Sequence, residues 1–200
     1  MSSRGPLFAV SLSAALLVPA IAHADPVGES STPTRAQQSL VGPNELSLDG
    51  GGSVSRIADR QGTVGVRYAR PMGSWALAVE PHAGLGAQDT ANTSTLVTSL
   101  GVDATVERRI PAGPVVFIVG AGGALDYVWQ RLQRTRGAPG TATFEAFSPG
   151  PVASFRARIP LWPNSWVDVG VRGSLGFTDL DGSMSGLWTV GASTSWGVSF

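Results

Sequence analysis

Apolar and polar side chains alternate along most of the chain after residue 44. Over residues 187–200 the even positions are mostly bulky and apolar, as at Trp188, Val190 and Trp196. The odd positions between them are mostly Gly, Ser and Thr. Alternation with a period of two indicates a β-strand with two different faces, and a helix with 3.6 residues per turn does not produce it. The C-terminal segment is therefore predicted to be a strand.

The same alternation recurs further upstream, so that eight amphipathic strands are predicted in all. It is clear at residues 63–69, 75–85, 96–107 and 167–177, and it is less regular at 115–129. Residues 45–56 and 144–159 complete the set with weaker patterns. Pro149 and Pro151 each remove an N–H that a strand ladder would use, so we expect the half of the last segment that contains them to be irregular.

The connectors between these strands alternate in kind. Three of them are tight and rich in Pro or Gly, at residues 70–73, 110–114 and 160–165. The connectors between those three are longer and polar, at residues 88–94, 130–143 and 179–186. Short turns at one end and longer loops at the other are typical of an antiparallel up-and-down meander.

The two faces of the strands decide which solvent surrounds the closed meander. A barrel with its apolar face inside is soluble, like the lipocalins and avidins, whereas one with that face outside is a membrane barrel. Here the second face carries mainly Gly, Ser, Ala and Thr, which fit the narrow lumen of eight strands, rather than the charges of a wet surface. The sequence therefore predicts an all-β fold, an eight-stranded antiparallel up-and-down transmembrane β-barrel over residues 44–200.

Aromatic residues gather near the ends of the predicted strands on the bulky face. Membrane barrels carry such girdles where their exterior meets the two interfaces. We expect the N-terminus and the C-terminal residue to lie in the periplasm and four loops to lie outside. The residues of the expected girdles are Tyr68, Trp75, Tyr127, Trp129, Trp188, Trp196 and Phe200.

A leader precedes the predicted barrel. Arg4 is followed by an apolar run and then by Ala-His-Ala at residues 22–24, with small residues at the two positions that a leader peptidase reads. The run is short, Pro19 interrupts it and no basic cluster follows, so a signal peptide over residues 1–24 is expected rather than a membrane anchor. Residues 25–43 have no apolar pattern and are expected to form a flexible segment.

Composition narrows the classes of function. The chain of 200 residues carries 14 basic and 14 acidic side chains, for a formal net charge of zero, so no nucleic-acid partner is predicted. Cys is absent from the sequence, which excludes disulfides, thiolate metal sites and thiol nucleophiles. Neither a cofactor nor a metal ion is predicted.

Taken together, the leader, the meander and the terminal strand at residues 196–200 give the chain a family resemblance. It resembles the eight-stranded outer-membrane β-barrels of Gram-negative bacteria, a class that includes the membrane domain of outer membrane protein A and its small single-domain relatives. The resemblance implies a location in the cell outer membrane, among its lipids. It also implies that the barrel-assembly machinery reads Trp196, Val198 and Phe200 as an assembly signal during insertion.

Charged residues on the small-residue face are the first candidate site. Buried charges must be paired, because an isolated one would cost several kcal/mol of desolvation. We interpret these residues as an ion-pair network that plugs the lumen, in which Asp168 can lie opposite Arg156 or Arg158. The alternative is a polar pathway for small solutes. The full set is Asp49, Arg67, Glu80, His82, Asp103, Glu107, Asp126, Arg156, Arg158, Asp168 and Arg172.

His82 and Glu80 lie on one face and could serve as an acid and base pair. Some small barrels of the resembled class are lipid A deacylases or palmitoyl transferases, and their active groups include a Ser near the His. Residues 80–84 supply no Ser, so a structural His is the better interpretation and no enzyme activity is predicted.

Arg131, Arg134 and Arg136 form a basic cluster in the predicted loop at residues 130–143. Such residues could bind lipopolysaccharide phosphates through charge-assisted hydrogen bonds, or they could simply be solvated in a mobile loop. The leading hypothesis for function is a plugged barrel with a structural or surface-interaction role. A small-solute channel is the alternative, followed by a lipid A-modifying enzyme.

Overall fold

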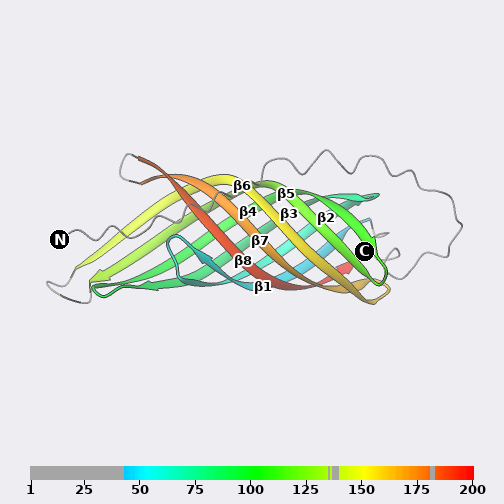
Figure 1. Cartoon of the computed structure of the whole chain (residues 1–200), viewed down its shortest axis with the longest axis horizontal. Coiled ribbons are helices and arrows are strands. Elements are labelled where there is room, and N and C mark those ends of the chain that lie inside the picture. Colours follow the sequence, from blue (N-terminus) through cyan, green and yellow to red (C-terminus); the bar gives the residue numbers. More distant parts are fainter. Residues whose placement is uncertain (1–42, 135, 137–139, 181–182) are drawn as a thin grey trace, which may run out of the picture. The chain divides into compact units, whose positions relative to one another are not determined.

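Eight antiparallel strands form a closed barrel in sequence order, in which β8 pairs back onto β1 (Figure 1). The computed structural model describes residues 43–134, 136, 140–180 and 183–200, so the predicted signal peptide and almost all of the segment at 25–43 lie outside the described residues. None of the described residues belongs to a helix long and apolar enough to cross a membrane. The strands are β1 (Glu45–Ser55), β2 (Arg60–Met72), β3 (Trp75–Asp89), β4 (Thr93–Ala112), β5 (Val115–Arg134), β6 (Thr141–Trp162), β7 (Ser165–Leu180) and β8 (Ser183–Ser199).

The orientation of the two faces follows the prediction. Val169 and Leu100 are half exposed on the outside, whereas Asp103 is buried inside. Successive side chains of a strand point to opposite faces, so a strand that alternates in sequence also alternates in environment. The predicted fold class, an eight-stranded antiparallel barrel, is confirmed.

The strands are longer than predicted at the end away from the chain termini. Long loops are predicted at residues 88–94, 130–143 and 179–186. This prediction is wrong for most of each segment, because strands β3 to β8 continue into them. Pairs such as Asp89 with Ser94 belong to the β3–β4 ladder although both residues are polar and neither is buried. Where a strand leaves the membrane both faces meet water, so the apolar alternation ends while the hydrogen-bonded ladder continues.

The expectation that the proline-containing half of β6 is irregular is also wrong. β6 runs without interruption from Thr141 to Trp162, and its pairing with β5 includes Pro149 and Pro151. Its pairing with β7, by contrast, begins only at Val152. The prolines therefore lie where β6 has a partner on one side, which is the position that tolerates a missing N–H.

Strand lengths set the height of the barrel. The 13 residues of β2 rise roughly 30 Å at about 3.3 Å per residue and a tilt of about 40°, which matches the thickness of a hydrocarbon core. β4, β5 and β6 contain 20, 20 and 22 residues, so they project beyond that core. The short turns at the opposite end include Gly73 and Gly113, which adopt the positive φ angles that glycine tolerates best.

Buried apolar side chains lie in the lumen near both of its ends. At the end away from the termini, the β1–β2 connector places Ile57 and Ala58 against Val97, Val128 and Leu187. Near the other end, fully buried apolar side chains come from β5 and β7, namely Val116, Ile118 and Trp166. At this end the apolar side chains lie among the charged ones, since Val116 pairs with Arg158 and Ile118 pairs with Arg109 in the strand ladders.

A charged lumen as the candidate functional site

Glu45, the first residue of β1, is the centre of a buried ion-pair network. Arg109 donates to its two oxygens at 2.6 and 2.7 Å, and Arg158 donates to Oε1 at 3.0 Å. A third guanidinium, that of Arg67, lies 3.9 Å away and also donates two hydrogen bonds to Glu107. All five side chains are almost completely buried. Three arginines therefore share the charge of two carboxylates at this level of the barrel.

Arg158, on β6, connects the network around Glu45 to β7. It lies directly opposite Asp168 in the β6–β7 ladder and donates to that carboxylate at 2.9 and 3.0 Å. Its guanidinium also stacks over the Trp166 ring, with Cζ 4.0 Å from the ring centroid. A bidentate ion pair covered by an indole ring holds the side chain in one geometry.

Two further pairs cross the middle of the lumen. Arg156 donates to Glu80 at 2.5 Å, between β6 and β3. Arg172 donates to both oxygens of Asp103 at 2.5 and 2.6 Å, between β7 and β4. Each pair joins strands that are not neighbours in the sheet, so these contacts close the lumen across its width.

His82 is held from two sides. Its Nε2 donates to Asp126 at 2.9 Å, and its Nδ1 lies 3.3 Å from the Glu80 carbonyl oxygen and 4.0 Å from an Asp103 oxygen. Gly101 lies beside this group, and a Cβ there would come within 2.6 Å of the imidazole. The ring is therefore fixed by polar contacts and by close backbone packing.

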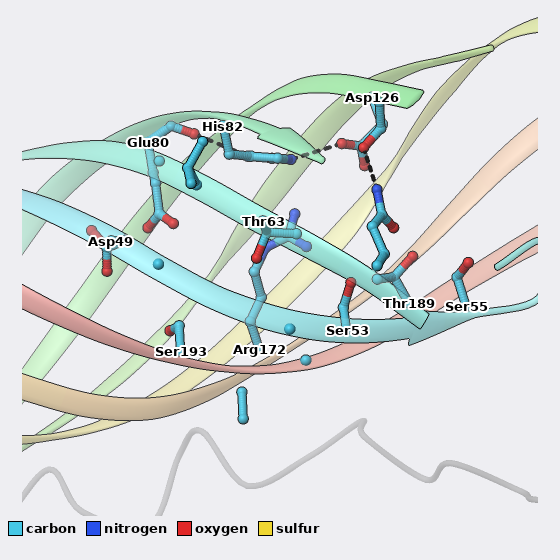
Figure 2. A pocket seen from close by; sticks show the side chains of 18 of the residues that line it. Asp49, Ser53, Ser55, Thr63, Glu80, His82, Asp126, Arg172, Thr189 and Ser193 are labelled. Atoms are coloured by element: carbon cyan, nitrogen blue, oxygen red, sulfur yellow. Dashed lines mark hydrogen bonds and ion pairs between the residues drawn. The ribbon is translucent and has the colours of Figure 1, made fainter. Parts of the chain in front are cut away.

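A cavity of about 80 Å³ lies between this network and the apolar cluster around Ile57, and residues of both line it. Figure 2 shows Glu80, His82 and Arg172 around it, together with Asp49 on β1. Asp49 accepts a hydrogen bond from Ser47 at 3.1 Å, and within the described part of the chain no basic nitrogen lies within 4 Å of its carboxylate.

The exterior of the barrel is apolar. Leu48, Val64 and Leu85 are about three-fifths exposed, and bulky aromatic residues such as Trp162 and Trp196 are more than half exposed. Such a surface far exceeds the few hundred Å² of contiguous apolar patch that a soluble monomer exposes. Its solvent is therefore lipid.

The sequence matches no family model and no curated protein. Among solved structures, the crystal structure of Neisserial surface protein A (NspA) is similar, with a TM-score of 0.57 and 14% identity over 79% of this chain and 97% of that chain. A major outer membrane protein from Thermus thermophilus has a TM-score of 0.51 and 14% identity over 78% of this chain and 99% of that chain. The chain has the fold of an eight-stranded outer-membrane β-barrel.

Its lipid-facing exterior agrees with that fold, so the barrel lies in the outer membrane. All eleven charged residues predicted for the lumen come from the inner face of the strands. The structure brings eight of them into four ion pairs, joins His82 to Asp126 by a hydrogen bond, and places Asp49 beside them. Of the two pairings that the sequence allows for Asp168, the structure contains the one with Arg158.

Glu45 and Arg109 were missed by the sequence reasoning. The signal was present, because Glu45 has the same parity as Asp49, and Arg109 has the same parity as Glu107. Extending the alternating pattern of each strand to the ends of that strand would have found both residues. Both lie near strand ends, where the apolar alternation is weakest.

The basic cluster lies mainly on a strand rather than in a loop. Arg131 and Arg134 belong to β5, and Arg136 follows it; all three are exposed. Just below them, the Tyr127 ring packs against Trp129 and Phe147, with centroids 4.9 and 4.7 Å apart. The β5–β6 hairpin therefore carries its arginines beyond a layer of aromatic rings.

Proposed function

We propose that this outer-membrane barrel is a closed structural protein that displays its β5–β6 hairpin at the cell surface. The observation that carries the proposal is the network centred on Glu45, in which buried arginines and carboxylates bridge strands across the lumen. Solutes would have to break several charge-assisted hydrogen bonds in a medium of low dielectric to pass, and each break leaves a buried charge unpaired. The apolar cluster around Ile57 at one end of the lumen supports the same conclusion.

Purified protein in planar bilayers tests this proposal. We expect no discrete single-channel steps, because ion pairs cross the lumen and the apolar cluster around Ile57 lies at one end of it. A large porin in the same bilayer serves as the positive control. Discrete, reproducible steps from the wild-type protein would favour the alternative, a small-solute channel, and would contradict the closed barrel.

No catalytic role is proposed for His82. Its two ring nitrogens face Asp126 and the Glu80 carbonyl, and no hydroxyl hydrogen-bonds to the ring among the residues described. The proton-accepting atom of a general base must lie within hydrogen-bond distance of the group that the base activates. The contacts of His82 therefore support a structural role.

The surface that we propose for interaction is the basic end of the β5–β6 hairpin. Arg131, Arg134 and Arg136 are exposed, and we propose that their guanidinium groups bind the phosphates of lipopolysaccharide through charge-assisted hydrogen bonds. Changing all three to Gln should weaken binding to lipopolysaccharide vesicles about fivefold per arginine at low salt, since each basic residue near an anionic surface contributes about 1 kcal/mol.

Vesicle co-sedimentation at increasing salt measures this effect. A matched control changes Arg70 and Arg108, which lie at the opposite end of the barrel, to Gln. Equal binding by the hairpin variant and the wild type would mean that these arginines are only solvated.

The role of Trp196, Val198 and Phe200 as an assembly signal stays a prediction; Trp196 and Phe200 face outward and are more than half exposed.

A further inference from the structure

A groove of about 780 Å³ lies on the lipid-facing exterior, across β8, β1, β2 and β3. Its volume falls within the range of roughly 300–1,000 Å³ that is typical of ligand pockets. The lining is mostly apolar and includes Val54, Leu85, Leu96, Val171 and Val190. A hollow of this size on a surface otherwise covered by large side chains needs a local cause.

The strand register supplies that cause. Ala192 pairs with Gly52, and Gly52 pairs with Gly62, so three small residues lie side by side on neighbouring strands. The same row continues to Val171 on one side and to Leu85 on the other. Neighbouring strands are about 4.8 Å apart, so roughly 19 Å along the curved sheet separates the two large side chains, with only glycines and an alanine between them.

A positively charged side chain lies at one end of the groove. Arg60, the first residue of β2, lines it and is exposed. Arg60 is the one charged residue that lines the groove among the residues described. β2 is just long enough to cross the hydrocarbon core, which places Arg60 at the interface on the side of the longer strands, the outer surface in barrels of this kind.

We propose that this groove binds lipid A of the outer leaflet, with acyl chains in the hollow and a phosphate at Arg60. An apolar hollow that ends at a cation is complementary to a lipid with an anionic headgroup. The hollow is several strand spacings wide, which suits a lipid with several chains side by side better than a lipid with one or two. The site is separate from the β5–β6 hairpin and does not depend on the role proposed for it.

The glycines allow a test in which the groove is filled without disturbing the barrel. A Cβ at Gly52 would lie 3.7 Å from its nearest neighbour and one at Gly62 would lie 4.0 Å away, both ordinary contacts. The double variant Gly52→Leu, Gly62→Leu should therefore fold and fill the hollow. Gly123→Leu is the matched control, because Gly123 also faces lipid, on β5, and its Cβ would have a nearest contact of 4.0 Å.

Native mass spectrometry of the full-length mature protein in detergent, with added lipid A, provides the measurement. We expect the wild type and Gly123→Leu to retain lipid A, and the double variant to retain at least tenfold less. Arg60→Gln should also reduce retention, whereas Arg70→Gln, at the other end of the same strand, should not. Heat-dependent mobility on a detergent gel verifies that each variant is folded.

Three results would overturn the proposal. The first is undiminished retention of lipid A by the folded double variant. The second is equal retention of phosphatidylglycerol and lipid A by the wild type, which would show a general lipid contact. The third is a wild-type dimer that the double variant lacks, which would make a second copy of the chain the occupant of the groove.

Discussion

Replacing Glu45 by Ala is expected to lower the free energy of unfolding by about 3–5 kcal/mol, the usual cost of removing one partner from a buried ion pair. The loss should lie at the upper end of this range because Arg109 has Glu45 as its only carboxylate partner within the described part of the barrel. Arg158 keeps Asp168, and Arg67 keeps Glu107. The buried guanidinium of Arg109 would therefore be left without a counter-charge.

Equilibrium unfolding in urea, with the barrel in detergent micelles or vesicles, measures this loss. Glu145→Ala is the control, since Glu145 is exposed and accepts a hydrogen bond from Tyr127 at the surface, so its removal should cost less than about 1 kcal/mol. Equal stability of the two variants would show that the Glu45 hub contributes little to the fold. It would also weaken the proposal of a rigid plug.

Gly122→Ala is expected to destabilise the barrel by about 3 kcal/mol, the upper end of the range for overpacking. A Cβ at this position of β5 would lie 1.9 Å from the Ala104 carbonyl oxygen and 2.8 Å from the Thr105 Cα. These are backbone atoms of β4, which cannot turn away as a flexible side chain can. The two strands would have to separate, with loss of ladder hydrogen bonds.

The neighbouring residue provides the comparison. A Cβ at Gly123 would have its closest contact at 4.0 Å, so Gly123→Ala should be neutral or slightly stabilising. Two measurements of stability check this: unfolding in urea, and the temperature at which the gel mobility shift is lost. In both, the wild type and Gly123→Ala should be about equally stable, and Gly122→Ala should be much less stable. A Gly122→Ala protein as stable as the wild type would contradict the close approach of β4 and β5.

Much of the lumen was predictable because side-chain direction in a strand follows parity. Once Asp103 and Glu107 are placed on one face of β4, that face must hold every second residue, and the small side chains around them indicate a crowded interior. Parity does not say which charges meet. The partners Arg172 and Asp103 lie 69 positions apart in sequence and on strands that are not adjacent, so only the closed barrel brings them together.

The outer ends of the strands were not predictable from polarity alone. β5 and β6 continue as a paired ladder from Gln130 opposite Phe144 to Gln133 opposite Thr141, although no residue on either face is buried there. Backbone hydrogen bonds hold this part of the hairpin, and they depend on a neighbouring strand rather than on the identity of each side chain. A polar sequence in this region therefore resembles a loop until its partner is known.

The amino-acid sequence by itself determined the class of this protein: a period of two, repeated in eight segments with bulky residues on one face and small ones on the other, is compatible only with an antiparallel barrel that faces lipid. Tertiary structure decided which arginine meets which carboxylate, how the β1–β2 connector closes the lumen, and where three small residues align into a groove. The physical reason is that a strand's own pattern specifies its two faces, whereas register and closure specify its neighbours.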